Sequence, residues 1–337
     1  MVSGIVLLDK PGGLSSNGAT RRLQHLFGAS SAGHLGTLDP FATGLLPVLL
    51  GDATRLIPWL DAEEKVYRAE AWFGIVTETL DREGAVVERR PVPPDLDDRL
   101  RVLLPSFVGR QRQRVPDYSA AKVRGMRRCD LVRAGRVVAP KFKEVVVRSL
   151  RLLELSVEGA AGEADRSGEG GAVGVGSGGT ASRTDPAARR VVLEVTCGPG
   201  TYIRQLVADL GAAVGCGACT VELRRLRVGT FGVDVAVSLE RIESIRPEER
   251  ASLFLDPRPH LPGPVWSAGD VAWDGLERGQ AVEWVGGGTG EGGRVVFVER
   301  GGRLRAVAER EGGRLWPRRV LREGLALGGG NPFDIVR

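Results

Sequence analysis

Residues 31–47 read SAGHLGTLDPFATGLLP, a stretch that contains three glycines and two prolines. Glycine permits backbone conformations that other residues avoid and proline fixes φ, so this loop has a specialised shape. Asp39 stands directly before Pro40, which biases Asp39 towards extended backbone. Two interpretations of Asp39 stay open at this point: a functional carboxylate in a shaped loop, or a helix N-cap with proline at the first helical position.

Regular elements are expected on both sides of this loop. Residues 17–27 have the apolar spacing of a helix, which Ser15 or Ser16 can cap and Gly28 can end. Residues 66–73 alternate between apolar and polar side chains, as a half-buried strand does. The sequence therefore predicts a helix before the loop and a strand after it.

Residues 202–214 form a second predicted helix, in which apolar residues recur every three or four positions. Arg204 lies in the first turn of this helix, where the helix dipole disfavours a positive charge. We therefore expect Arg204 to have an anionic partner.

The length and composition indicate a folded protein of about two domains. The chain has 337 residues, of which 42% are hydrophobic and 26% charged, which excludes disorder throughout. It lacks an apolar run of the ~20 residues that a membrane span needs. The apolar run before Asp9 is only four residues long (Ile5 to Leu8), too short for the core of a signal peptide, so a cytoplasmic location is expected.

Two segments of unusual composition suggest how the chain is divided. Residues 158–188 are rich in glycine and hold no aromatic residue, so apolar burial cannot offset the entropy of ordering them. They are expected to be a flexible surface insertion that joins two strands of one domain. Residues 257–264 (PRPHLPGP) resemble a linker.

Strands and helices are mixed before this linker, which predicts an α+β domain over residues 1–256. Beyond the linker, short β-type runs alternate with glycine-rich turns and predict a small all-β domain over residues 265–337. These runs are 281–285, 294–298 and 304–308.

Positive charge is concentrated in residues 110–136, which hold nine Arg or Lys and two Asp in a chain of net charge +5. Alternating arginines at the start of this segment would project from one face of a strand, and later ones from a helix. A solvated surface is one interpretation, and a stripe that contacts phosphates is the other. The candidate RNA-backbone contacts are Arg110, Arg112, Arg114, Lys122, Arg127 and Arg128.

Few other residues suggest chemistry by themselves. The chain has only three tyrosines, and Tyr67, Tyr118 and Tyr202 all lie in segments dense in charge or glycine, which slightly favours a functional role. Its three histidines spell out neither a catalytic triad nor a metal cluster, so no metal site is expected. Cys216 and Cys219 form a lone C-x-x-C that we interpret as small buried residues.

Together, several segments resemble the bacterial TruB-type tRNA pseudouridine-55 synthases. They occur in the order of that family, and the G-H-x-G-x-L-D-P string is the most specific of them. The segments are residues 4–11 (GIVLLDKP), 15–17 (SSN), 32–47, 65–68 (KVYR), 118–122 (YSAAK), 200–204 (GTYIR) and 223–226 (LRRL). Residues 276–321 resemble the PUA-type RNA-binding domain of the same family.

The resemblance implies a fold and an activity. The fold would be a pseudouridine-synthase-like catalytic domain with a central mixed, largely antiparallel sheet and peripheral helices, followed by a small PUA-like β domain. The activity would be the isomerisation of uridine to pseudouridine in the T-loop of tRNA, without cofactor or metal. The partner would be the T-arm and elbow of tRNA, bound by a monomer that needs no other protein.

The resemblance also implies roles for individual residues. Asp39 would be the catalytic carboxylate acting on a flipped-out uridine, and Arg204 would pair with it. Tyr67 would stack on the uracil and could serve as general base. The remaining substrate contacts would be His34, Tyr202 and Leu223.

Two other functions stay open. One is an RNA-binding protein without catalysis, such as a tRNA folding helper or a ribosome-assembly factor. The joint presence of Asp39, Tyr67 and Arg204 argues against it, because a pure RNA binder has no need for an aspartate that repels phosphate. The other is a guide-RNA-dependent rRNA synthase related to the archaeal and eukaryotic branch, which shares the catalytic motifs.

Overall fold

The computed structural model describes residues 2–60, 62–157, 188–284 and 294–328. The chain divides into two compact units, one made of residues 1–64 and 225–337 and the other of residues 65–224. The predicted linker at 257–264 lies within the first unit, and the predicted domain boundaries stay a prediction.

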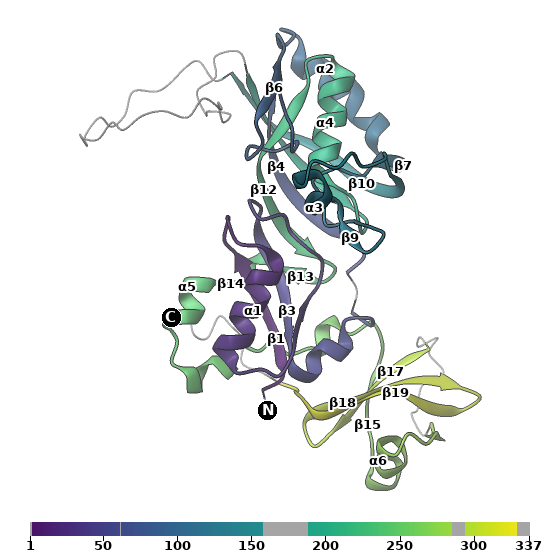
Figure 1. Cartoon of the computed structure of the whole chain (residues 1–337). Helices are drawn as coiled ribbons and strands as arrows, with labels where there is room; N and C mark the ends of the chain where they lie inside the picture. Colours follow the sequence, from purple (N-terminus) through teal and green to yellow (C-terminus); the bar gives the residue numbers. More distant parts are fainter. Residues whose placement is uncertain (1, 61, 158–187, 285–293, 329–337) are drawn as a thin grey trace. The chain divides into compact units, whose positions relative to one another are not determined.

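The sheet of the first unit has its most buried strands at its centre, and its strand order is β14–β1–β3–β12 (Figure 1). Strand β1 pairs antiparallel with β3 and parallel with β14, and β2 pairs with β3. The bounds are β1 (Gly4–Lys10), β2 (Ala32–His34), β3 (Thr43–Leu50), β12 (Ala218–Val228), β13 (Phe231–Gly232) and β14 (Val237–Ser238).

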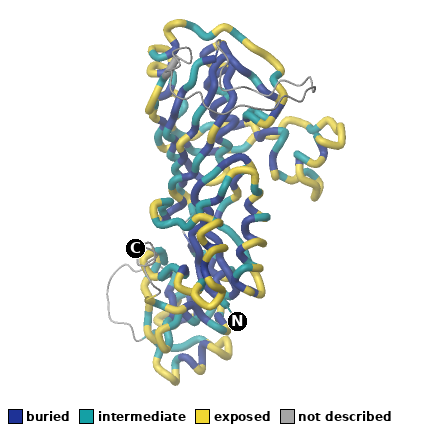
Figure 2. The backbone as a smooth tube through the Cα atoms, turned by 90° about the vertical axis from the view of Figure 1, so that its left-hand side faces the viewer, coloured by how far each residue is buried: buried dark blue, intermediate teal, exposed yellow. Residues whose placement is uncertain are grey.

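Both faces of β1 are covered, which explains the continuous apolar run from Ile5 to Leu8. Val6 and Leu8 face the cluster that contains the buried side of helix α1 (Ser16–Phe27). Ile5 and Leu7 face a second cluster, which contains residues of the 3-10 helix η1 (Gly51–Leu56). The same burial is visible as a dark blue centre in the tube of Figure 2.

Helix α1 confirms the predicted helix and its end signals. The Ser15 side chain accepts a hydrogen bond from the Gly18 backbone N–H (3.0 Å). Gly28 ends the helix with φ of 62°, a left-handed conformation that glycine adopts without strain. The later helical segments of this unit are α5 (Leu239–Ser244), η3 (Val233–Val235), η4 (Pro247–Leu253) and η5 (Arg258–His260).

The C-terminal part of the first unit is a five-stranded sheet in the order β15–β17–β18–β19–β16. Its strands are β15 (Val265–Ser267), β16 (Val282–Glu283), β17 (Val295–Arg300), β18 (Arg303–Glu311) and β19 (Arg314–Ala326). The expectation of an all-β domain was wrong in one respect, since helix α6 (Asp270–Glu277) packs on this sheet. Trp273 and Leu276 of the helix are buried in the cluster that covers one sheet face.

This C-terminal sheet shares a core with β1 and β3. Phe297, Leu304 and Leu321 belong to the same buried cluster as Ile5 and Leu7. Polar contacts add to the packing: the Asp52 carboxylate accepts from the backbone N–H groups of Glu323 (2.6 Å) and Gly324 (3.2 Å). The sheet is therefore fixed to the part of the unit that contains residues 31–47, which we call the Asp39 loop.

The second unit is built on the strand order β12–β4–β11–β10–β7. Helices α2 and α4 lie side by side on it (Figure 1). The bounds are β4 (Lys65–Phe73), β5 (Ile75–Thr77), β6 (Val86–Arg89), α2 (Leu96–Leu103), η2 (Leu104–Phe107), β7 (Gly109–Arg114), β8 (Lys122–Val123), β9 (Met126–Arg127), α3 (Arg128–Arg133), β10 (Phe142–Val157), β11 (Arg189–Cys197) and α4 (Ile203–Val214).

The sheet of this unit continues across the glycine-rich segment, as the sequence predicted. Strands β10 and β11 pair antiparallel from Val147 opposite Cys197 to Val157 opposite Arg189. The predicted insertion at 158–188 lies outside the described residues except for Ala188, which is buried. Among the described residues, no helix is long and apolar enough to cross a membrane.

Candidate active site

The Asp39 loop is a turn that leads into a strand. The Ala42 backbone N–H donates to the Asp39 carbonyl (3.1 Å), with Pro40 at the second position of the turn, and the chain then enters β3. No helix follows Asp39. The N-cap interpretation was therefore wrong, because Pro40 initiates a turn rather than a helix.

The residue before Asp39 is held by a buried serine. The Ser16 hydroxyl accepts from the Leu38 N–H (2.8 Å) and donates to the Leu38 carbonyl (2.9 Å). Ser16 is 1% exposed, so water does not compete for these bonds. The first turn of α1 thus fixes both backbone groups of Leu38.

The residue after Asp39 is held from the other side. The Pro40 carbonyl accepts from the Lys10 ammonium (3.1 Å) and from the Gly13 N–H (2.9 Å). Lys10 is fully buried and also donates to the Pro11 and Leu14 carbonyls, at 2.7 Å each. The backbone on both sides of Asp39 is therefore fixed, and the half-buried Asp39 carboxylate is presented from a rigid loop.

His34 lies at the end of β2, a few residues before Asp39. Its Nε2 lies 3.3 Å from the Asn17 side-chain oxygen. Burial lowers the pKa of His34 below its ordinary value, and the nearby charge of Arg225 lowers it further. His34 is therefore neutral at neutral pH.

Arg204 belongs to the second unit, at the start of α4. Its guanidinium donates to the Thr79 carbonyl (2.6 Å), to Oδ2 of Asp81 (2.9 Å) and to the Tyr118 carbonyl (3.0 Å). The side chain is 4% exposed, so these partners compensate a buried charge. The predicted anionic partner is thus present as Asp81. Asp39 and Arg204 belong to different units, and their pairing stays a prediction.

Asp81 is a site residue that the sequence reasoning missed. Its carboxylate also accepts from the Thr79 hydroxyl (2.5 Å) and from the Glu83 N–H (3.0 Å). Leu80 beside it has φ of 64°, which is uncommon for a residue with a side chain. The pattern T-x-T-x-D over residues 77–81 was the available signal, because threonine hydroxyls near an aspartate can orient its carboxylate.

The other predicted substrate contacts of the second unit lie on strands or at the helix start. Tyr67 on β4 and Leu223 on β12 are buried, at 6% and 5% exposure. Tyr202 directly precedes α4, and the Gln113 side chain bonds both its backbone N–H (2.9 Å) and its carbonyl (3.0 Å). The Lys143 ammonium lies 5.2 Å from the centre of the Tyr202 ring, a cation–π distance.

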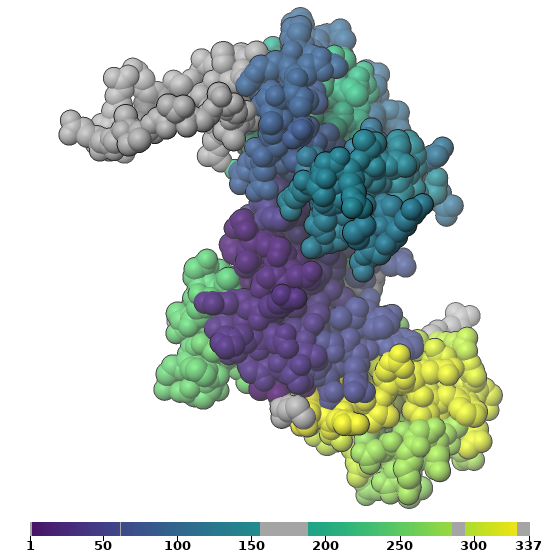
Figure 3. Space-filling model, viewed as in Figure 1, coloured from purple at the N-terminus to yellow at the C-terminus, as the bar shows by residue number. Residues whose placement is uncertain are grey.

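The first half of the basic segment follows the prediction. Arg110, Arg112 and Arg114 alternate along β7 and are all exposed. The Arg112 guanidinium lies 4.5 Å from the Phe142 ring centre. In Figure 3 this segment forms part of the accessible surface of its unit.

The second half departs from the prediction of one helix. Arg127 belongs to the hairpin of β8 and β9, and only Arg128–Arg133 are helical. Arg128 is 1% exposed, and its guanidinium donates to Asp117 (2.5 Å) and to the Ala139 carbonyl (2.9 Å). A buried guanidinium does not reach an RNA phosphate, so we remove Arg128 from the candidate RNA contacts.

The C-x-x-C residues behave as the small buried residues expected of them. Cys216 and Cys219 are 1% and 0% exposed. Burial raises the pKa of Cys219 to about 12, so its thiol stays protonated. Among the described residues, no group of three or more His, Cys, Asp or Glu side chains is placed to hold a metal ion.

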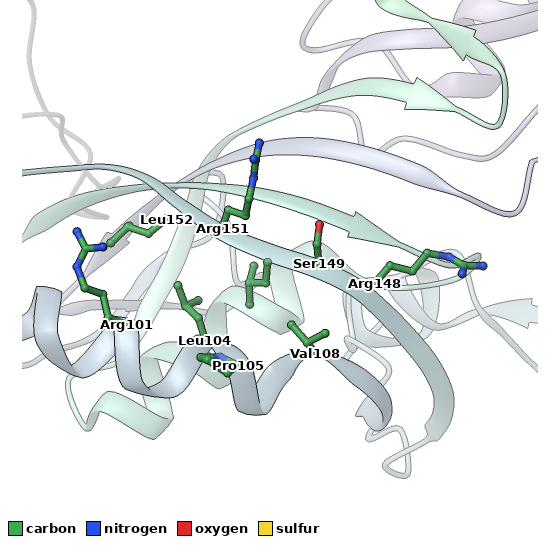
Figure 4. Close-up of a pocket in the computed structure, with 9 residues that line it drawn as sticks. Arg101, Leu104, Pro105, Val108, Arg148, Ser149, Arg151 and Leu152 are labelled. Atoms are coloured by element: carbon green, nitrogen blue, oxygen red, sulfur yellow. The ribbon is translucent and has the colours of Figure 1, made fainter.

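A surface groove of about 630 Å³ lies elsewhere in the second unit (Figure 4). Leu104 and Val108 line it from the η2 side, and Ser149 and Leu152 from β10. None of the candidate site residues lines this groove, so it is separate from the candidate active site.

Solved structures with a similar fold include chains of two larger complexes. A chain of a Cbf5-Nop10-Gar1 complex matches with a TM-score of 0.56 and 24% identity, covering 94% of this chain and 84% of that chain. A chain of an H/ACA RNP bound to a substrate RNA containing 2'-deoxyuridine matches with a TM-score of 0.56 and 21% identity, covering 94% and 84%. These matches define the fold class: α+β with a large mixed sheet and a C-terminal β domain.

Sequence comparisons then give the family. Residues 24–168 match the TruB family pseudouridylate synthase (N terminal domain), and residues 204–257 match the tRNA pseudouridylate synthase B C-terminal domain. The tRNA pseudouridine synthase B of Stutzerimonas stutzeri (strain A1501) is 38% identical over 95% of this chain and 96% of its own. That of Ectopseudomonas mendocina (strain ymp) is 39% identical over 76% and 74%. The chain belongs to the TruB family of pseudouridine synthases, which makes it an isomerase.

Proposed function

We propose that this protein isomerises uridine to pseudouridine at position 55 in the T-loop of tRNA, with Asp39 as the catalytic carboxylate. The observation that carries the proposal is the anchoring of Asp39 between Leu38 and Pro40, whose backbone groups are held by Ser16, Lys10 and Gly13. A reactive carboxylate needs such a fixed position. The names of the relatives, which are tRNA pseudouridine synthases, support tRNA as the substrate.

The reaction requires a carboxylate but no second one to activate water. The bond between uracil N1 and ribose C1′ breaks, the base turns, and a bond forms between C5 and C1′. The proton on C5 is lost and N1 gains one, so the product is an isomer of the substrate. Asp39 can stabilise an oxocarbenium-like sugar or attack it. Water must be kept out while the base is detached.

The remaining roles follow from the chemistry of the residues. The target uridine must leave its stack to expose C1′, and Tyr67 would stack on the extruded uracil and could take up its proton. Tyr202 and Leu223 would line the uridine pocket. Arg204 would pair with Asp39 and keep it ionised, and its rigid hold on Asp81 supports such a positioning role.

RNA backbone contacts would come from the exposed cations of the second unit and from the C-terminal sheet. Without the buried Arg128, the candidate contacts are Arg110, Arg112, Arg114, Lys122 and Arg127. His34 would lie near the tRNA loop. The protein would act as a monomer on the T-arm and elbow of tRNA in the cytoplasm, without an obligate protein partner and without cofactor.

The test is a reaction of the purified protein with an unmodified tRNA transcript, with no cofactor added. Pseudouridine is mapped by mass spectrometry. We expect modification at position 55, and we expect Asp39→Asn to lose it while RNA binding is retained. Asp98→Asn, an exposed residue of α2, is the matched control and should stay active.

Two outcomes would contradict the proposal. Turnover of Asp39→Asn within about tenfold of wild type would exclude Asp39 as the catalytic carboxylate, because losing a catalytic group costs far more. RNA binding without any modification by the wild-type protein would favour the RNA-binding function instead.

A further inference from the structure

Arg225 is a fully buried arginine on β12, within the first unit, which also contains the Asp39 loop. Its Nε donates to the Leu45 carbonyl (2.8 Å), and one Nη donates to the Gly36 carbonyl (2.9 Å). The same Nη lies 3.5 Å from the Leu35 carbonyl. One guanidinium therefore bonds backbone on both sides of Asp39.

The two bonded positions are the two ends of residues 36–45, the part of the loop that contains Asp39. Gly36 has φ of 79°, and Gly44, next to Leu45, has φ of 96°. Glycine adopts a positive φ without strain, and it also leaves the backbone most free to move at these two points. A contact that joins these ends restrains the loop that lies between them.

We propose that Arg225 is a positioning residue for the isomerisation: its guanidinium clamps the two ends of the loop and so fixes the place of Asp39. The inference rests on the proposed function, since it assigns Arg225 to the loop of the catalytic carboxylate. Ser16, Lys10 and Gly13 fix the middle of this loop, and Arg225 fixes its base.

The chemistry of arginine suits this role better than that of any other residue. The guanidinium is planar and presents donors in a fixed fork, so it can bond two carbonyls from separate backbone segments at once. A lysine ammonium keeps the charge but is a single point on a flexible stem. Burial of an arginine among carbonyl groups is unfavourable unless these bonds form, so the bonds are maintained.

The test compares Arg225→Lys, which keeps the charge, and Arg225→Gln, which removes it. Arg227→Lys is the matched control, because Arg227 lies on the same strand but is partly exposed and pairs with Glu64. Single-turnover kinetics and RNA affinity are measured for each. We expect a displaced carboxylate to lower the rate by about 100-fold in both Arg225 variants, with RNA affinity close to wild type.

Two readouts separate positioning from a general effect on stability. Hydrogen exchange at the Leu38 and Ala42 amides should be faster in both Arg225 variants than in Arg227→Lys. The His34 ring, followed by NMR, should titrate at higher pH in Arg225→Gln, which loses the charge near it, than in Arg225→Lys. Unchanged loop exchange, a full rate in Arg225→Lys, or failure of both variants to fold would overturn the proposal.

The exchange measurement also distinguishes this proposal from the proposed function. If the wild-type protein modified no tRNA, the function would be refuted. Faster loop exchange in the Arg225 variants would then still show the clamp. If Asp39→Asn were inactive and Arg225→Lys fully active, the function would stand and the positioning role of Arg225 would be excluded.

Discussion

Arg204 and Asp81 form an ion pair in which the side chains are 4% and 6% exposed, with 2.9 Å between Nη1 and Oδ2. The pair lies next to the start of α4, where the helix dipole opposes the positive charge of Arg204. A buried pair of this kind stays together, because neither charged group can become solvated unless the residues around it move. Asp81 thereby fixes the direction of the Arg204 guanidinium.

Asp81→Asn should destabilise the protein strongly. The substitution removes the carboxylate charge but leaves the buried Arg204 charge, and breaking a buried pair costs about 3–5 kcal/mol. Urea unfolding followed by circular dichroism measures the free energy of unfolding. Glu88→Gln is the control, because Glu88 pairs with Arg90 at the surface and such pairs contribute about 0–1 kcal/mol. Equal losses in the two variants would show that Asp81 does not hold Arg204.

Ser16→Ala should lower both stability and activity. It leaves the buried N–H and carbonyl of Leu38 without the serine hydroxyl, which costs about 1–3 kcal/mol, and it loosens the residue next to Asp39. Unfolding and single-turnover rates are measured together. Ser15→Ala is the matched variant: it removes the cap of α1, costs about 1 kcal/mol and should leave the rate unchanged. A rate loss of similar size in both would contradict the role of Ser16 at the loop.

The stability of the protein should fall between pH 7.5 and pH 5.5 in part because of His34. Burial first, and the charge of Arg225 second, lower the pKa of His34 in the folded protein. Below the ordinary pKa of about 6.5 the unfolded chain binds the proton more readily than the folded protein, so stability is lost as the pH falls towards the folded pKa.

His34→Gln should therefore make the free energy of unfolding less dependent on pH over this range. The measurement is urea unfolding at several pH values. His25→Gln, at an exposed position of α1, serves for comparison. An unchanged pH dependence in His34→Gln would refute the effect.

Arg112→Gln should weaken tRNA binding and reduce its salt dependence. The loss of one phosphate contact lowers the slope of log affinity against log salt by about 0.7–0.9. Fluorescence titrations at several salt concentrations measure this slope. Arg112→Lys keeps the charge and should retain the slope, and the same slope in all three proteins would exclude Arg112 from the RNA contacts.

Local features of the sequence were reliable guides to single elements. Ser15 and Gly28 marked the two ends of α1, because capping depends on residues within a few positions of each other. Alternation identified β4, with Tyr67, Ala69 and Ala71 buried on one face. The apolar run from Ile5 to Leu8 does not alternate with polar residues, because both faces of β1 are buried. Only the fold shows this burial.

The local signal was ambiguous where two short-range interpretations fit the same residues. Asp-Pro is compatible with a helix N-cap and with a turn. The structure has the turn, in which Leu38 bonds Ser16 of α1 and Pro40 bonds Lys10. Likewise, Arg128 was expected at the surface because it lies in a segment rich in positive charge. Its guanidinium is buried instead, where it bonds Asp117 and the Ala139 carbonyl.

The sequence by itself determined the family, the elements around the site and the expectation that Arg204 has an anionic partner. Motifs, caps and periodicity are properties of neighbouring residues, so they can be recognised without the fold. Only the tertiary structure decided that Asp81, 123 positions away, meets that demand, and that Arg225 bonds Leu45 across 180 positions. Such contacts depend on how strands are ordered in a sheet. That order is set by packing of the whole unit, which no local pattern encodes.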